Sequence, residues 1–282
     1  MAHPLLTRRS WIGAAGAALA ATPNRFPGPP GLQMYSLRRE AAKDLEGALG
    51  LVRRLGFREL EVGDLQGRSA TEYAQLAAVH GLKTTCFGAS WEELSRSADA
   101  VAGTARVLGA SYVMCPSIPG KTLDAESTAR AAASFNRWGE SLGRAGLRFC
   151  YHPHGPEFAP GDGGTWFDLL ARRMDPKLAN FEMDVFWFVL GGVDPVRALE
   201  GYPGRFPLMH LKDPRKGEPR TFDPGPVEEE ASVPLGTGQV DWRRVLRAAL
   251  RHGVEHFYIE EEHPDALRQI RQSLGYLERL AL

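Results

Sequence analysis

The chain has 282 residues, and its 34 lysine and arginine residues are balanced by 34 aspartate and glutamate residues. A neutral chain without a long basic run lacks the charge pattern of nucleic-acid-binding proteins. No run of about 20 apolar residues follows the N-terminus, which argues against stable membrane insertion. The length instead suits a single large barrel domain of about 250 residues.

The first 30 residues differ in composition from the rest. Arg8 and Arg9 precede an Ala/Gly-rich stretch at 13–21, and a Pro/Gly-rich stretch follows it. Paired arginines, a weakly apolar segment and small residues near a cleavage point are typical of a signal peptide, and the arginine pair resembles a twin-arginine export signal. We therefore expect residues 1–30 to be a signal peptide and leader. The protein would then be exported to the periplasm or another extracytoplasmic space. The alternative is a flexible Ala-rich tail.

The rest of the chain alternates between two kinds of segment. Short apolar runs predict strands at 31–37, 59–63, 83–87, 112–115, 147–151, 179–185, 206–211 and 256–260. Apolar residues at helical spacing predict helices at 45–55, 69–79, 91–108, 123–145, 165–174, 195–199, 242–251 and 266–280. Residues 214–238, rich in Pro, Gly and Glu, predict a long surface loop.

Strict alternation of eight strands with eight helices favours a parallel sheet closed into a barrel. We therefore predict a (β/α)8 TIM barrel over residues 31–282. A doubly wound open sheet is the alternative. No G-x-G-x-x-G motif follows the first strand, so a dinucleotide-binding fold has little support.

Ionisable residues gather at the ends of the last four predicted strands. They are His152, His154 and Glu157; Glu182 and Asp184; His210, Lys212 and Asp213; and Glu260, Glu261 and Glu262. The C-terminal strand ends of a TIM barrel hold its chemistry. A charged residue after an apolar run costs free energy unless it is paired or binds a metal. Each residue alone is readily explained as a solvated loop charge, but the joint pattern at Asp184, His210 and Glu260 predicts a metal site. Carboxylates with imidazoles suit Mn, Mg, Co or Zn.

Five segments resemble the sugar phosphate isomerase/epimerase superfamily of xylose isomerase-like barrels. They are 32-LQMYSL-37, 151-YHPHGPEF-158, 181-FEMDVFW-187, 204-GRFPLMHLKD-213 and 235-LGTGQVDW-242. The resemblance runs from about Gly31 to the C-terminus and implies one divalent metal ion. The family holds this ion with Glu, Asp, His and Glu from strands five to eight, and Asp184, His210 and Glu260 match the last three of these ligands.

The first of the four ligands is where this chain departs from the family. The epimerases place a Glu where this sequence has His152. We expect Glu157 to supply the missing oxygen from the following loop, with His152 as the alternative ligand. The resemblance further implies that His154, Lys212 and Glu61 contact the substrate.

The implied reaction is isomerisation or epimerisation of a sugar or keto sugar through a metal-stabilised enediolate. Glu260 would take one acid–base role, and His152 or His154 would take the other because imidazole has a pKa near neutrality. No Gly-rich phosphate cradle is evident, which argues against a sugar phosphate as substrate. We expect a small-molecule sugar as the ligand and no nucleic acid. The resemblance also allows a homo-oligomer.

Three other functions stay open. The same intermediate can expel a leaving group, so a lyase or dehydratase acting on a 3-keto sugar or glycoside is an alternative. A metal-dependent hydrolase is another alternative, because DNA-cleaving endonucleases have the same barrel fold. Those enzymes use more metal ligands and a basic face, whereas this chain is neutral. A non-catalytic sugar-binding barrel is the alternative of another class. Trp166, Phe186, Trp187 and Phe188 either line a sugar pocket or pack the core.

Overall fold

The computed structural model describes residues 26, 28–120, 122–161, 163–222 and 228–282. The predicted signal peptide up to residue 25 lies outside the described residues. Phe26, near the end of the predicted leader, packs edge-on against Phe257 with ring centroids 5.2 Å apart. Among the helices of the described residues, none has the length and apolar character needed to cross a membrane.

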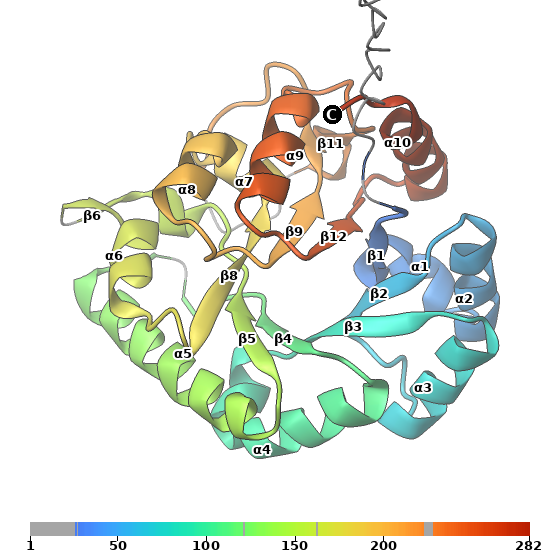
Figure 1. The fold of residues 1–282 in the computed structure, drawn as a ribbon, viewed down its shortest axis with the longest axis horizontal. Coiled ribbons are helices and arrows are strands. Elements are labelled where there is room, and N and C mark those ends of the chain that lie inside the picture. Colours follow the sequence, from blue (N-terminus) through green and yellow to red (C-terminus); the bar gives the residue numbers. More distant parts are fainter. Residues whose placement is uncertain (1–25, 27, 121, 162, 223–227) are drawn as a thin grey trace, which may run out of the picture.

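Parallel strands close into a barrel at the centre of the molecule (Figure 1). In order around the barrel they are β1 (Gly31–Gln33), β2 (Glu59–Val62), β3 (Lys83–Gly88), β4 (Tyr112–Cys115), β5 (Arg148–Tyr151), β8 (Ala179–Asp184), β9 (Leu208–Leu211) and β12 (His256–Ile259). Leu32 of β1 pairs with Ile259 of β12, which closes the ring. The predicted TIM barrel is confirmed, and the open sheet is excluded.

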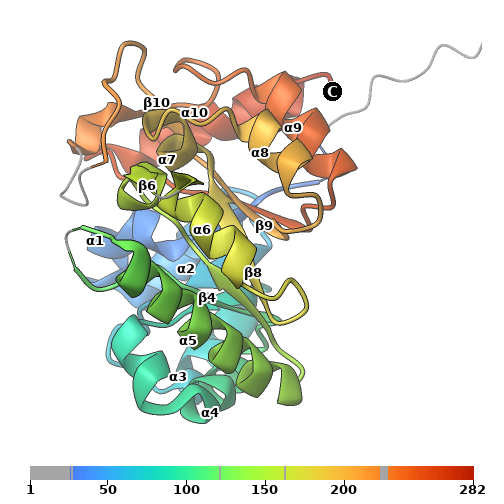
Figure 2. The same ribbon diagram turned by 90° about the vertical axis from the view of Figure 1, so that its left-hand side faces the viewer.

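Helices follow the strands and surround the barrel (Figure 1 and Figure 2). They include all eight predicted helices: α2 (Leu45–Arg54), α3 (Ala70–Val79), α4 (Trp91–Leu108), α5 (Ala125–Arg144), α6 (Trp166–Arg173), α8 (Pro195–Gly201), α9 (Trp242–Arg251) and α10 (Ala266–Arg279). At the start of many of these helices, the side chain of the N-cap residue accepts a hydrogen bond from a backbone N–H of the first turn. The Ser69 hydroxyl, for example, accepts the Glu72 N–H at the start of α3, and the Glu72 carboxylate accepts the Ser69 N–H.

Short elements absent from the sequence prediction shape the C-terminal rim of the barrel. They are the helices α1 (Arg38–Ala41) and α7 (Val185–Leu190), the 3-10 helices η1 (Met34–Leu37), η2 (Pro156–Phe158) and η3 (Glu229–Ala231), and the strand pairs β6 (Pro160–Gly161) with β7 (Gly164–Thr165) and β10 (Asp213–Pro214) with β11 (Ser232–Val233). The first predicted strand therefore ends at Gln33. The predicted loop at 214–238 carries η3 and β11.

Successive side chains along each barrel strand point alternately outward, toward the helices, and inward, into the barrel. Met209 and Leu211 of β9 point outward into the large cluster beneath the helices, whereas Leu208 belongs to a small cluster inside the barrel. That inner cluster consists of Cys86, Tyr112, Met114, Cys150, Leu208 and Tyr258. Because side chains alternate with a period of two, the residue two positions after an inner-cluster residue also points inward, one layer nearer the C-terminal rim.

Candidate metal centre and active site

The residues that follow the inner cluster form an ionisable layer at the C-terminal ends of the strands. His152 lies two positions after Cys150, His210 two after Leu208, and Glu260 two after Tyr258. Asp184 ends β8, whose Phe181 and Met183 point outward, so its side chain also points into the barrel. Strand alternation thus aims one ligand-type side chain from each of four neighbouring strands at the barrel axis.

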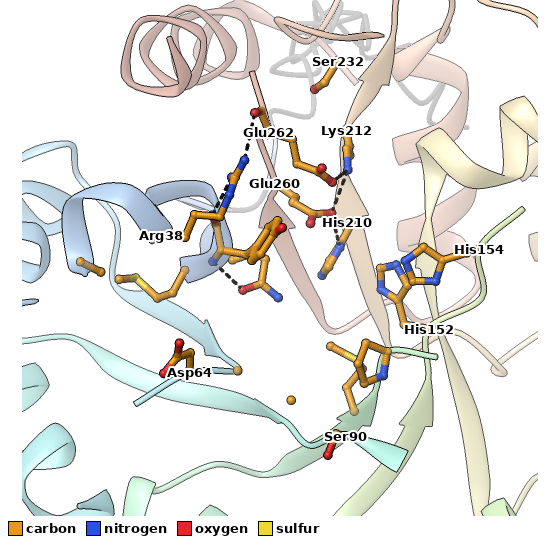
Figure 3. Close-up of a pocket in the computed structure, with 18 of the residues that line it drawn as sticks. Arg38, Asp64, Ser90, His152, His154, His210, Lys212, Ser232, Glu260 and Glu262 are labelled. Atoms are coloured by element: carbon orange, nitrogen blue, oxygen red, sulfur yellow. Dashed lines mark hydrogen bonds and ion pairs between the residues drawn. The ribbon is translucent and has the colours of Figure 1, made fainter. Parts of the chain in front are cut away.

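These side chains converge on one point. Candidate ligand atoms of His152, Asp184 and His210 all lie within 4.8 Å of one another. Asp184 Oδ2 is 3.7 Å from His152 Nε2, and Glu260 Oε2 is 3.0 Å from His210 Nδ1. Figure 3 shows His152, His210 and Glu260 side by side, and His154 next to His152.

The residues present fit a divalent metal ion. Asp184 Oδ1 accepts the Phe186 N–H at 2.8 Å and so begins α7. Its other oxygen, Oδ2, is buried and has no hydrogen-bond partner within the described structure. An unpaired buried carboxylate oxygen is costly, and a cation between Asp184 and the imidazoles would satisfy it. A mixed set of imidazole and carboxylate ligands suits Zn, Mn or Co.

A cavity of about 630 Å³ opens beside this point. Phe186 and Trp187 of α7 form an aromatic part of its wall, and Arg38 and Glu229 stand on a charged side. The Trp187 ring lies 5.2 Å from the His154 ring. In Figure 3, Asp64 and Ser90 lie across the cavity from the ionisable layer, in the segments that follow β2 and β3. The cavity therefore offers a ligand both an apolar ring face and charged hydrogen-bonding groups.

Comparison with known proteins places this fold and site in a family. The model of the xylose isomerase-like TIM barrel family matches residues 49–280, which is most of the chain. The chain belongs to the xylose isomerase-like TIM barrel family. The sequence resemblance to sugar phosphate isomerases/epimerases is confirmed, and members of this family include isomerases/epimerases and dehydratases.

Three relatives show the range of this family. The chain is similar to inosose dehydratase from Bacillus licheniformis, at 27% identity over 169 residues. That match covers 55% of this chain and 54% of the dehydratase, so it spans about half the length of the relative. The crystal structure of a sugar phosphate isomerase/epimerase from Parabacteroides distasonis superimposes with a TM-score of 0.73 at 25% identity, covering 95% of this chain and 98% of that one. The IOLI protein with a bound zinc atom superimposes with a TM-score of 0.69 at 16% identity, over 87% of this chain and 96% of that one.

Glu157 lies apart from the ligand cluster of this xylose isomerase-like barrel. The chain turns into η2 after His154 and folds Glu157 back under the strand end, where the residue is buried. Its Oε1 accepts the Tyr151 hydroxyl at 2.6 Å, and its Oε2 accepts the His154 N–H at 2.9 Å. Both oxygens of Glu157 are thus engaged away from the cluster, and the geometry favours the alternative ligand, His152.

The two histidines after β5 have depressed pKa values. Burial, followed by the charge of His210, lowers the pKa of His152 to about 3. Burial also lowers the pKa of His154 well below its usual range. Both imidazoles are therefore neutral near pH 7. A neutral imidazole suits the role of metal ligand, whereas the acid–base role predicted for His152 rested on a pKa near neutrality. His154 lines the cavity, where we predicted a substrate contact.

Lys212 and Glu260 form a charged pair in the cavity wall. Lys212 Nζ lies 3.5 Å from Glu260 Oε2 and also pairs with Glu262. Burial opposes the charge of Lys212, but the Glu260 and Glu262 carboxylates outweigh it and raise its pKa. Burial likewise opposes the charge of Glu260, but Lys212 and His210 outweigh it and hold its pKa well below the usual range. Both groups are therefore ionised at the cavity surface.

Glu61 lies beneath the candidate metal centre. It is fully buried, and its Oε1 is 3.0 Å from His210 Nε2. Burial and the neighbouring Glu182 raise the pKa of Glu61 to about 8. Glu61 does not line the cavity, where we predicted that it contacts the substrate, and lies against His210 instead. Burial opposes the charge of His210, but Glu182, Glu61 and Glu260 outweigh it and raise the pKa of this imidazole.

Other candidates have structural or unforeseen roles. Asp213 accepts hydrogen bonds from three backbone N–H groups and from the Trp242 indole, away from the metal centre. Phe186 and Trp187 line the cavity, whereas Phe188 packs in the core against Phe158 with ring centroids 4.6 Å apart.

Three charged residues of the cavity wall were not predicted from the sequence: Arg38 and the loop carboxylates Glu228 and Glu229. They carry no spacing signal, because they reach the cavity only through the packing of α1 and η3 at the rim.

Proposed function

We propose that this protein is a divalent-metal-dependent isomerase or epimerase of a small sugar or keto sugar. The observation that carries the proposal is the convergence of His152, Asp184 and His210 beside the cavity, with Asp184 Oδ2 left unpaired. These three residues and Glu260 would hold one cation. When bound, the cation would supply a positive charge that stabilises negative charge developing on a substrate oxygen. The zinc atom in the IOLI protein supports this proposal.

Glu260 is the group suited to take the proton from the carbon next to the substrate carbonyl. It is ionised because Lys212 and His210 hold its pKa low. Lys212, 3.5 Å from it, can donate a hydrogen bond to a substrate oxygen. Its ammonium lies over the Phe186 ring, with Nζ 4.9 Å from the ring centroid, and both residues line the cavity. The aromatic wall would pack against the apolar face of a sugar ring.

Dehydration is the second candidate reaction. The likeness to inosose dehydratase favours it, and so does the pairing of Glu260 with Lys212. A base and a protonated amine on the same side of a cavity can remove a proton and assist departure of a hydroxyl group.

Deuterium exchange would test the proposal. The purified protein with measured metal content would be incubated with free ketoses and 3-keto glucosides in D₂O and followed by NMR. We expect deuterium to enter the carbon next to the carbonyl, and exchange to stop when the metal is chelated. We expect Glu260→Gln to slow exchange about 10²- to 10⁴-fold, the contribution of a positioned general base. Glu255→Gln, at the other end of β12, is the matched control and should exchange at the wild-type rate.

The products separate the candidate reactions. An epimer or isomer supports the proposal, and an unsaturated product supports the dehydratase. A protein that holds stoichiometric metal but exchanges no deuterium into any of these ketoses would contradict both reactions and favour a sugar-binding barrel.

A further inference from the structure

Two carboxylates lie directly beneath the proposed metal centre, inside the barrel. Glu61 of β2 and Glu182 of β8 are both fully buried, and neither lines the cavity. We call them the lower carboxylate pair. The layer below them is the apolar inner cluster, which includes Cys86, Cys150 and Tyr258. Two carboxylates in this position are expensive, because burial of a charged or unpaired polar group costs several kcal/mol.

Each member of the lower carboxylate pair contacts a different histidine. Glu182 Oε2 is 3.1 Å from His152 Nδ1, within hydrogen-bond distance. Glu61 Oε1 is 3.0 Å from His210 Nε2, again within hydrogen-bond distance. Glu182 Oε1 also lies 3.3 Å from His210 Nε2. Gln33 donates its amide N–H to Glu61 Oε1, which fixes that carboxylate from β1.

These contacts indicate which nitrogen of each ring a bound cation would take. A neutral imidazole has one N–H and one lone pair, so a carboxylate acceptor at one nitrogen leaves the lone pair on the other. His152 with its proton on Nδ1 presents Nε2, the atom that lies 3.7 Å from Asp184 Oδ2. His210 has a carboxyl oxygen 3.0 Å from each nitrogen, Glu61 Oε1 at Nε2 and Glu260 Oε2 at Nδ1. Because Glu260 is itself a ligand of the proposed centre, a bound cation would take the lone pair of Nδ1 and leave the proton on Nε2, facing Glu61. Both free nitrogens therefore face another ligand of the proposed centre.

We propose that the lower carboxylate pair consists of positioning residues that set the tautomer and orientation of the metal-binding imidazoles, Glu182 for His152 and Glu61 for His210. The inference rests on the metal centre of the proposed function, and not on which reaction that centre catalyses. It also explains how this chain places an imidazole where the epimerases have a carboxylate. An imidazole ligand needs an acceptor on its second nitrogen, and Glu182 lies two residues before Asp184 on the adjacent strand, where it can provide one.

Zinc affinity tests the positioning role. Zinc binding would be measured by competition with a chromophoric chelator for the wild type, Glu182→Leu, Glu61→Leu and Glu182→Gln. We expect each Leu variant to bind zinc about 10- to 100-fold more weakly, the usual effect of losing an outer-shell partner. Glu182→Gln keeps one acceptor oxygen and should recover part of the loss. Glu157→Leu, which removes an equally buried carboxylate that contacts neither imidazole ring, should bind zinc like the wild type.

Histidine tautomers distinguish positioning from general destabilisation. In zinc-loaded, ¹⁵N-histidine-labelled protein, long-range ¹H–¹⁵N spectra should show His152 protonated at Nδ1 and His210 at Nε2. Glu182→Leu should alter the His152 pattern more than that of His210, and Glu61→Leu should do the reverse. Signals would be assigned with His152→Asn and His210→Asn.

Unchanged tautomers and zinc affinity in both Leu variants would overturn the inference, as would an equal loss of affinity in Glu157→Leu. Wild-type zinc binding with the expected tautomers but no deuterium exchange would uphold this inference and overturn the proposed function.

Discussion

At the scale of single residues, Asp184 has both a structural contact and a place in the candidate site. One of its oxygens begins α7 by accepting the Phe186 N–H, and the other is left buried and unpaired beside His152. Burial is the main reason why its pKa rises to about 7. In the metal-free protein, Asp184 therefore loses its proton at a cost that an unfolded chain does not bear.

The free energy of unfolding of the metal-free protein should therefore depend on pH. Because the pKa of Asp184 is higher in the folded than in the unfolded chain, its contribution favours folding at low pH and is lost as the pH rises toward 7. Asp184→Asn stays neutral. The melting temperature of the chelated Asn variant, relative to the chelated wild type, should thus increase from pH 5 to pH 8. Each pKa unit of difference corresponds to about 1.4 kcal/mol.

Thermal unfolding at several pH values, with chelator and with added zinc, measures this effect. Zinc should raise the melting temperature of the wild type much more than that of Asp184→Asn. A difference between the two chelated proteins that is the same at pH 5 and pH 8 would show that Asp184 ionises without a folding cost.

At the scale of elements, the contact between α5 and the start of β8 sets where the sixth barrel strand lies. A Cβ atom added at Gly139 of α5 would meet the Leu178 carbonyl oxygen at 2.1 Å, so only glycine allows this approach. Leu178 directly precedes β8, the strand that carries Glu182 and Asp184. A shift of α5 would therefore move the residues of the proposed metal centre.

Alanine substitutions within α5 provide a matched pair. Gly139→Ala should destabilise the protein by about 1–3 kcal/mol, because the backbone must move to relieve the clash. Gly143, in the same helix, has open space around the position of a Cβ. Gly143→Ala should stabilise the protein by about 0.5–1 kcal/mol, since alanine has the higher helix propensity. Denaturant unfolding measures both, and equal stability of the two variants would contradict the packing argument.

Asp213 of β10 fixes the position of residues 236–242, the segment that leads into α9. Its carboxylate accepts the N–H groups of Gly236, Gly238 and Val240 and the Trp242 indole N–H, at 2.8 to 3.2 Å. Asp213→Ala leaves these donors without an acceptor and should cost about 3 kcal/mol or more. Asp241→Ala removes only the N-cap of α9 and should cost about 1 kcal/mol. Urea unfolding of the two variants compares them directly, and a similar loss in both would show that Asp213 is no more than another cap.

At the scale of the whole molecule, we propose that residues 1–30 direct export of the folded barrel. Twin-arginine export carries folded proteins, which suits a protein that takes up its metal before crossing. Replacing Arg8 and Arg9 by lysine should leave the full-length protein in the cytoplasm, as measured by cell fractionation and N-terminal sequencing. The same double change at Arg53 and Arg54 of α2 is the control and should not alter export. An unchanged distribution of the Arg8/Arg9 variant would exclude this export route.

Much of the fold was predictable from sequence, because the period of apolar residues is a local property. It gave the eight barrel strands and their helices with bounds that differ by at most a few residues, apart from Met34–Leu37 and α7. The run 185-VFWFVL-190 is apolar throughout, so periodicity does not distinguish a strand from a buried helix there. The inward positions of Asp184, His210 and Glu260 also followed, since each continues the alternation of its own strand.

The sequence by itself thus determined the barrel and three of the proposed ligands. Only the tertiary structure favours His152 over Glu157 as the proposed ligand, because a 3-10 turn after the strand folds Glu157 onto Tyr151. It also placed Glu61 against His210, a residue 149 positions away along the chain. The pKa values likewise depended on the tertiary structure, because burial and neighbouring charges arise only when β2, β5, β8 and β9 meet. The periodicity of apolar residues is a property of a short stretch of chain, whereas contacts across the barrel form only when the barrel closes.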